Sequence, residues 1–390
     1  MRAAVKQPVT YADVWEFWLK NPELAAAVDF ITIHILPYWE DEPVSIEHAI
    51  DHVNAVYRKV QAAFPGKRIV IGEVGWPSTG RMRDGARPSL VNEARFVRAV
   101  VALALKSGLD YNIVEAFDQP WKRALEGTVG GHWGLLDAGR APKFALSGPV
   151  SDDPDWPWQG AVAALFAALV CAGLARWGPR LGRRNWLVYA GAAQLLGTFL
   201  ALDGALTAAI CWSPFGWIAG GLGLAASLLL AVLLLRALAA GLAGGAWPRM
   251  PLPTVEEAIN LLRGRPVPGP TLGERMLGLL QFGFAVGAAV VTVALVVDPR
   301  YRDFPSQAFL VPAVGLAGLA LSRDQRPSPA ASLREEALLV ALLLAGAAIV
   351  AVSEGLENSQ AIGWCATLVL LAAPWSLKLA SSRRAVQTAA

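Results

Sequence analysis

The sequence predicts two domains of different fold class, an α/β region over residues 1–155 and an all-α polytopic membrane domain over residues 156–390. Composition is the first reason: 55% of the 390 residues are hydrophobic and 17% are charged, which is too apolar for a soluble protein of this length. The second reason is that Leu, Ala, Val and Gly dominate after Trp158, whereas earlier segments have an ordinary mixture. The third is an alternation of strand-like and helix-like segments in the first region.

The α/β region contains three apolar runs of strand length, separated by segments with helical periodicity. The expected strands are Val28 to Leu36, Arg68 to Gly72 and Tyr111 to Ala116. The expected helices are Tyr11 to Lys20, about Ser45 to Phe64, and Ser89 to Lys106, the last stopped at Gly108. Parallel strands buried beneath helices are the expected result.

The second region contains about seven apolar segments near the length needed to cross a bilayer. They run approximately from Gly160 to Ala175, Trp186 to Leu206, Phe215 to Leu235, Met276 to Val297, Gln307 to Leu321, Ala337 to Val352 and Ala361 to Leu379. Because the first, fifth and sixth are short, counts of six and eight stay open. Arg and Lys residues gather after every second segment, and such loops remain cytoplasmic. The pattern predicts a cytoplasmic C-terminus and residues 1–155 outside the cytoplasm.

Polar and aromatic residues follow each expected strand of the α/β region. They are His34, Tyr38, Trp39, Glu40 and Asp41 after the first, Glu73 and Trp76 after the second, and Glu115, Asp118, Gln119, Trp121 and Lys122 at the third. In parallel sheets and barrels the carboxyl ends of the strands carry the chemistry. Carboxylates among Trp and Tyr side chains suit a sugar site, because aromatic faces pack on pyranose C–H groups while carboxylates perform acid–base work. The alternative is that these aromatic residues are only core.

Three segments stand out, namely IGEVGWPSTG, DFITIHILPYWED and YNIVEAFDQPWKRALEGTVGGHWGLL. Together they resemble glycoside hydrolase family 17, the β-1,3-glucanase family with a (β/α)8 barrel. IGEVGWPSTG resembles its nucleophile segment, DFITIHILPYWED the preceding strand and substrate loop, and YNIVEAFDQPWKRALEGTVGGHWGLL the last strand and closing loop. The resemblance implies a partial TIM barrel containing the last strands only. The segments are most similar to bacterial members fused to membrane domains, which implies a multi-pass protein of the bacterial inner membrane involved in β-glucan synthesis or remodelling.

The resemblance assigns roles to individual residues. Glu73 matches the nucleophile, which in a retaining glycosidase attacks the anomeric carbon while a second carboxyl protonates the leaving oxygen. Water as acceptor gives hydrolysis, and a glucan hydroxyl gives transglycosylation. The substrate-binding positions implied are His34, Tyr38, Trp39, Trp76, Glu115, Asp118, Trp121, Lys122 and Glu126. His34 is expected to bond either sugar or Glu73, or to be a satisfied barrel histidine, and Glu126 is alternatively a helical partner of Lys122. Gln119 departs from the carboxylate of many relatives.

The family's proton donor, a Glu after Asn at the end of the fourth strand, has no counterpart before Val9, and neither Glu16 nor Glu23 fits its motif. We therefore expect a fragment or one product of a split gene, with little or no glycosidase activity by itself. The alternative function is a non-catalytic glucan-binding or assembly factor docked to a membrane glucan synthase. A transporter with a sugar-binding accessory domain is a third possibility, but charged residues inside the spans are nearly absent.

The expected partners are a β-glucan and the lipid bilayer, with a membrane glucan synthase as a further candidate. No organic cofactor and no metal are implied, because the chemistry requires only carboxyl groups. The three cysteines, Cys171, Cys211 and Cys365, lie in or beside apolar segments, where they act as small hydrophobic residues. The net charge of +3 and the dispersed Arg clusters argue against nucleic acid as a partner.

Overall fold

The computed structural model describes residues 5–248, 260, 263, 265, 270–322 and 334–389, with side chains to residue 381. The chain forms two units. The α/β unit consists of Met1–Pro154 together with two short segments from later in the chain, Arg300–Asp303 and Glu354–Ser359. The helical unit contains the remainder, beginning at Asp155. Each unit has its own hydrophobic core, so each is described by itself.

A four-stranded parallel sheet forms the centre of the α/β unit. Its strands are β1 (Ala12–Val14), β2 (Ile31–Ile35), β3 (Ile69–Val74) and β4 (Asp110–Ile113), paired in chain order. Parallel strands that neighbour each other in sequence order are the arrangement of a (β/α)8 barrel wall. The three strands expected from the sequence are present, with ends that differ by one to three residues. The last of them, β4, ends at Ile113, so Val114–Ala116 lie beyond the strand.

Strand β1 corrects the expectation of a continuous helix from Tyr11 to Lys20. Only Trp15–Lys20 is helical, as α1, and Ala12–Val14 pair with Thr32–His34 of β2. The Thr10 hydroxyl reinforces this pairing, since it lies 2.8 Å from the Phe30 carbonyl and 2.9 Å from the Thr32 hydroxyl. Pairing with a neighbouring strand thus outweighs the helical pattern of this short segment.

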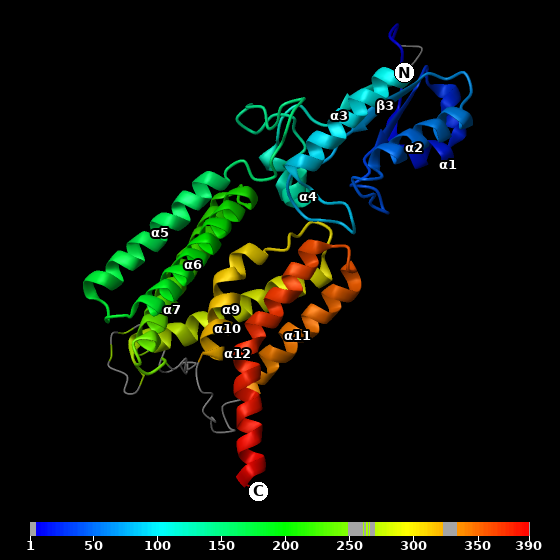
Figure 1. Cartoon of the computed structure of the whole chain (residues 1–390). Coiled ribbons are helices and arrows are strands. Elements are labelled where there is room, and N and C mark those ends of the chain that lie inside the picture. Colours follow the sequence, from blue (N-terminus) through cyan, green and yellow to red (C-terminus); the bar gives the residue numbers. More distant parts are fainter. Residues whose placement is uncertain are drawn as a thin grey trace. The chain divides into compact units, whose positions relative to one another are not determined.

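Helices α2 (Ala49–Ala63) and α3 (Leu90–Ser107) connect the strands and pack beside each other in the same unit (Figure 1). Val53, Val56 and Val60 recur at helical spacing on α2 and are buried against the sheet. The Ser89 side chain accepts a hydrogen bond from Asn92 N and begins α3, and Gly108 ends it at φ +67°. The sequence predicted both ends of this helix correctly.

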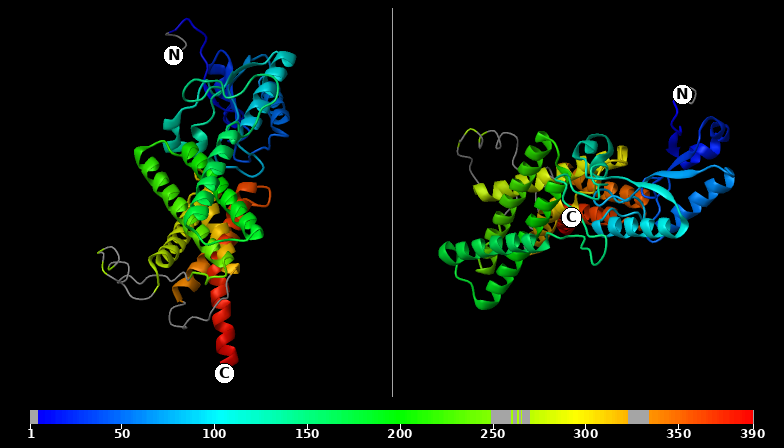
Figure 2. Two further views of the ribbon diagram at one scale, coloured as in Figure 1. Left: turned by 60° about the vertical axis from the view of Figure 1, so that its left-hand side comes forward. Right: turned by 90° about the horizontal axis from the view of Figure 1, so that it is seen from above.

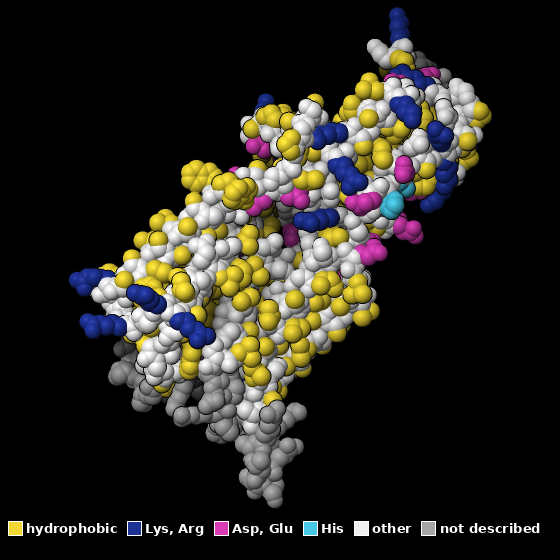
Figure 3. Space-filling view, in the orientation of Figure 1, with side chains coloured by type: hydrophobic (Ala, Val, Ile, Leu, Met, Phe, Trp, Pro, Cys, Tyr) yellow, Lys and Arg dark blue, Asp and Glu magenta, His cyan; other side chains and the backbone are white. Residues whose placement is uncertain are grey.

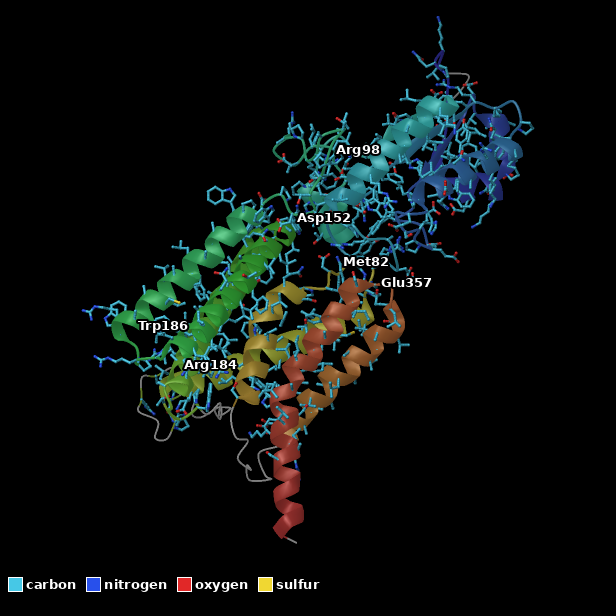
Figure 4. All side chains as sticks on the ribbon, viewed as in Figure 1. Met82, Arg98, Asp152, Arg184, Trp186 and Glu357 are labelled. Carbon is cyan, nitrogen blue, oxygen red and sulfur yellow. The ribbon has the colours of Figure 1, made fainter. Side chains whose placement is uncertain are left out.

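Residues 145–152 run along α3 and are bonded to it before the chain enters the helical unit. Arg98 donates to the carbonyls of Ala145 and Gly148, at 2.6 and 2.9 Å. The Asp152 carboxylate accepts a bond from Val91 N at 2.9 Å, at the first turn of the helix (Figure 4). An acceptor there satisfies a backbone N–H that has no partner within the helix.

The helical unit is made of long apolar helices. Their bounds are α5 (Trp156–Trp177), α6 (Arg183–Ile210), α7 (Pro214–Leu242), α9 (Leu272–Val297), α10 (Leu310–Leu321), α11 (Arg334–Glu354) and α12 (Ser359–Ala389). Helix α5 packs along α6, and α7 packs against α6 and α10 (Figure 2). The buried core of α9 and α12 includes Trp364, whose indole N–H donates to Thr292.

Large apolar side chains cover much of the visible surface of the helical unit, whereas Lys and Arg gather at its α5–α6 connection (Figure 3). Leu165 is 60% exposed, Leu222 68% and Val293 58%. Such a surface is compatible with a membrane-spanning region. Within the described residues, six helices are long and apolar enough to cross a bilayer, a count that the sequence left open, and Ser306–Leu321 is a shorter apolar helical stretch. The fifth expected span contains α10, whose 12 residues extend about 18 Å.

A buried ionic cluster joins α3 to the loop that follows β4. Lys143 Nζ lies 3.0 Å from a Glu93 oxygen and 3.0 Å from Asp118 Oδ1, and all three side chains are less than a tenth exposed. Burial raises the pKa of Glu93 to about 8, since the ammonium that would counter it is shared with Asp118. Burial also acts to raise the pKa of Asp118, but His132 and Lys143 outweigh it and hold that pKa below its usual value.

The raised pKa of Glu93 predicts a pH dependence of stability. The folded state holds a proton that the unfolded state, with an ordinary pKa near 4.5, releases. This contribution is complete below about pH 4.5 and is lost as the pH rises toward about 8. We expect the Glu93→Gln variant to lose much of the decline in the melting temperature of the α/β unit between pH 5 and 8.

Differential scanning calorimetry of the full chain at several pH values measures this effect. The matched control is Glu23→Gln, because Glu23 is exposed. A Glu93→Gln variant whose melting temperature falls with pH as steeply as that of the wild type would contradict the assignment.

Candidate active site

Glu73 lies on the less buried face of β3 because the strand contains a bulge. The register pairs Ile33 with Ile71 but His34 with Glu73, so Gly72 is the additional residue. The buried positions Ile69, Ile71 and Val74 are accordingly spaced by two and then by three. A Cβ atom at position 72 would lie 2.4 Å from Thr32 Cγ2, so only glycine fits. The bulge therefore turns the Glu73 carboxylate away from the core at the carboxyl end of the sheet.

His34 holds the Glu73 carboxylate from the neighbouring strand. Its Nδ1 lies 2.7 Å from Glu73 Oε2, and the side chains are 20% and 43% exposed. A carboxylate only accepts, so Nδ1 carries the proton. The hydrogen bond from His34 is the largest influence on Glu73 and, with the charge of Lys122, lowers its pKa although burial opposes this. The sequence left three roles open for His34, and the structure places it on Glu73.

Glu115, Gln119 and Lys122 form a second polar cluster beside Glu73. Lys122 Nζ lies 2.7 Å from Glu115 Oε2, and the Gln119 amide donates to the same oxygen. Lys122 belongs to a short 3-10 helix, Pro120–Lys122, that continues into α4 (Arg123–Gly130). The Lys122 ammonium thus forms its ion pair with Glu115. The sequence had offered Glu126, four residues further along a helix, as an alternative partner. The Lys122 charge also helps to keep Glu73 ionised.

Glu126 projects from α4 toward the same charges. Burial raises its pKa, Lys122 lowers it, and the charges of Glu115 and Glu73 raise it further. Glu73 and Glu126 are therefore neighbouring carboxyl groups whose pKa values are shifted in opposite directions. Environments that separate two carboxyl pKa values in this way are typical of acid–base sites.

A pocket of about 300 Å³ opens next to His34. Trp15 and Trp39 provide aromatic walls, and the charged lining comes from Glu16, Lys20, Glu40, Asp41 and Arg300. The Trp15 indole N–H is 3.3 Å from Glu40 Oε1, and Glu40 Oε2 lies 2.9 Å from His52 Nε2. Aromatic walls with a few polar groups at the rim are common in small-molecule sites.

Three of the predicted sugar-binding residues, Tyr38, Trp76 and Asp118, are buried in the structure. Tyr38 is fully buried and donates to the Arg81 carbonyl at 2.7 Å, and Trp76 is 1% exposed with its N–H on the Arg87 carbonyl. Asp118 belongs to the buried cluster with Lys143. The polar atoms of each side chain thus have partners within the α/β unit, and their sugar-binding role stays a prediction. Trp121, in contrast, is 61% exposed.

Sequence reasoning missed several pocket residues. Trp15 was assigned to a helix interior, and Glu16, placed in the middle of that helix, lies in the first turn of α1 directly after β1. The signal for both was present, since they follow a strand as the other site residues do. Arg300 is far from the barrel motifs in sequence, and no local pattern indicates it. Among the described residues, no group of three or more His, Cys, Asp or Glu side chains is arranged to hold a metal ion.

Residues 1–134 match the BtgE/BtgC glycoside hydrolase domain. A glucan 1,3-beta-glucosidase of Arthroderma benhamiae is 31% identical over 37% of this chain and 51% of its own length. A probable glucan endo-1,3-beta-glucosidase of Aspergillus clavatus is 30% identical over 37% of this chain and 23% of its own length. The chain thus spans about half or less of these relatives.

A solved structure is similar as well. The family 17 beta-1,3-glucanosyltransferase of Rhizomucor miehei is 30% identical, with a TM-score of 0.33, over 37% of this chain and 52% of that protein. The match of residues 1–134 and the named relatives confirm the resemblance that the three motifs carry. Over residues 1–134, the α/β unit of this chain is similar to the glycoside hydrolase family 17 domain that these relatives share.

Proposed function

We propose that the α/β unit acts on β-1,3-glucan through a covalent intermediate on Glu73, and that the helical unit tethers it to a membrane. The observation that carries the proposal is the His34–Glu73 hydrogen bond of 2.7 Å at the carboxyl end of the sheet. A lowered pKa keeps Glu73 ionised, as a nucleophile requires. The relatives similar to 37% of this chain are named for activity on 1,3-beta-glucans.

In the first step, a Glu73 oxygen attacks the anomeric carbon of a glucosyl unit and forms a glycosyl ester. The bond between that carbon and the leaving atom breaks. A leaving glucan oxygen needs a proton from a second carboxylic acid, the role of the family's fourth-strand Glu that has no counterpart before Val9, whereas an activated group such as fluoride leaves as the anion without it. His34, as donor to Oε2, orients the carboxylate so that Oε1 faces the sugar. Lys122 stabilises the negative charge before the attack.

The acceptor in the second step decides between hydrolysis and transfer. Water returns free sugar, whereas a hydroxyl of a second glucan forms a new glycosidic bond with retained configuration. As either acceptor attacks the anomeric carbon, its proton passes to a base, which is the second carboxylate in a retaining glycosidase, and the Glu73 carboxylate is released. An aromatic-walled pocket beside the nucleophile favours a bound glucan over water at this position. We therefore favour glucan transfer, in remodelling or synthesis beside a membrane glucan synthase.

The tether is proposed to place the α/β unit on the periplasmic side of a bacterial inner membrane, with the C-terminus in the cytoplasm. Arg300–Asp303 and Glu354–Ser359 belong to the same unit, so the chain between them crosses the bilayer an even number of times. Helix α11 supplies one crossing, which requires the shorter Ser306–Leu321 to be the other. This count gives seven crossings, in agreement with the alternation of basic loops.

Trapping with an activated donor tests the nucleophile directly. A 2-deoxy-2-fluoro laminaribiosyl fluoride needs little acid assistance to lose its leaving group, and its fluorine slows the second step. We expect the full chain in detergent to gain the mass of one glycosyl group, located on Glu73 by peptide mass spectrometry. Glu73→Gln should reduce labelling by at least about 10³-fold, because the amide is a poor nucleophile.

The control for trapping is Glu47→Gln, which changes an exposed carboxylate that forms an ion pair with Arg95. Labelling of another carboxylate would contradict the role of Glu73. Binding of laminari-oligosaccharides without labelling would instead favour a non-catalytic glucan-binding protein.

His34→Ala tests the positioning of the carboxylate. Because the hydrogen bond from His34 lowers the pKa of Glu73, its removal raises that pKa, and the ionised form is lost at a higher pH as the solution is acidified. We expect the acid limb of the pH–rate profile with an aryl laminaribioside to move to higher pH, with about a tenfold loss of rate at pH 5. His34→Asn retains a donor near Nδ1 and should restore the limb; an unchanged limb in His34→Ala would contradict the role.

A further inference from the structure

The segment Arg300–Asp303, which links α9 to α10, is part of the α/β unit and reaches its aromatic pocket. The Arg300 guanidinium lies 5.8 Å from the centre of the Trp39 ring, and the Tyr301 ring is 6.1 Å from the same ring. Arg83 approaches Trp39 within 5.9 Å. Trp39 is therefore surrounded by two cations and two tyrosines, since Tyr38 stacks on it at 5.6 Å.

Three contacts fix the backbone of this segment within the unit. The Tyr301 carbonyl packs on Gly127, where a Cβ atom would lie 2.2 Å from the carbonyl oxygen and φ is +70°. The Thr128 hydroxyl donates to Asp303 at 2.5 Å, and Arg81 donates to the Arg302 carbonyl at 2.8 Å. Every residue after Arg300 in the segment is thus anchored, so Arg300 is held at the pocket before a ligand arrives.

The segment Glu354–Ser359, also part of the α/β unit, bonds to the loop that contains Arg81 and Met82. Arg81 is 5% exposed and also pairs with Glu354. Asn358 Nδ2 donates to the Met82 carbonyl at 3.0 Å and to Glu354 at 2.9 Å, near Glu357 (Figure 4). The loop that contains Arg81 and Arg83 is therefore held on both sides, although Arg83 itself stays half-buried at the Trp39 ring.

We propose that Arg300 and Tyr301 complete a glucosyl-binding subsite with Trp39. The ligand class is a β-1,3-linked gluco-oligosaccharide, so the inference rests on the proposed function. Trp39 and Trp15 provide apolar walls for a pyranose ring, and the Arg300 fork supplies N–H donors to its hydroxyls beside Glu40 and Asp41. His34 lines the same pocket and bonds Glu73, so this subsite is next to the reacting sugar.

Calorimetric titration of the full chain with laminaripentaose in detergent tests the subsite. We expect Arg300→Ala to weaken binding by about tenfold or more, as is typical for loss of a hydrogen bond from a charged group. Arg300→Lys should recover only part of this, because it keeps the charge but not the fork. Tyr301→Ala should also weaken binding, and Trp39→Ala serves as the reference for loss of the pocket wall.

The matched control is Arg95→Ala, which removes an exposed arginine paired with Glu47 and outside the pocket. Its affinity should equal that of the wild type. If Trp39→Ala weakens binding while Arg300→Ala and Tyr301→Ala bind as the wild type, the subsite is overturned and the proposed function stands. If the wild type binds no laminari-oligosaccharide, both proposals are overturned.

Discussion

The hydrogen bond between His34 and Glu73 is the contact on which the site depends. It exists because β2 and β3 are neighbouring parallel strands and because the bulge at Gly72 brings position 73 opposite position 34. Without the bulge, the alternation of the strand would point the carboxylate at the buried face that Ile69 and Ile71 occupy. One glycine in the strand therefore determines which face of the sheet the Glu73 carboxylate occupies.

The residues around this contact form two layers, one charged and partly accessible and one buried. The outer layer, with Glu115, Lys122 and Glu126, carries charges that remain partly accessible and set the pKa of the carboxyl groups. The layer beneath it is closed, since Tyr38 and Trp76 each satisfy their polar atom on a backbone carbonyl. These two hydrogen bonds connect the loop after β2 and the end of β3 to the backbone at Arg81 and Arg87. Rigid support of this kind keeps a nucleophile within reach of its target.

Periodicity in the sequence was sufficient to predict most of the α/β unit. Strands β2 and β3 and helices α2 and α3 have apolar patterns and end signals that do not depend on distant residues. Strand β1 has only three residues, and its extended conformation depends on pairing with β2. Because β2 lies about 20 residues later, the local sequence pattern gives no information on this pairing. The fifth apolar segment contains α10, a helix of 12 residues, and hydropathy does not show whether so short a helix crosses a bilayer.

The candidate site was predictable to the extent that its residues follow strands. Glu73, His34 and Lys122 were found in this way and lie together. Motif position does not report burial: Tyr38, Trp76 and Asp118, which the resemblance assigns to sugar binding, are buried and bonded to partners within the unit. Arg300 is 266 residues from His34 along the chain (300 − 34), and only the folded structure brings it to the pocket.

A structure of the full chain with a bound laminari-oligosaccharide tests the central claim most directly. The account predicts an anomeric carbon about 3–3.5 Å from Glu73 Oε1, with His34 still bonded to the other oxygen. A saccharide bound elsewhere, or a Glu73 side chain turned from it into the core, would contradict the account.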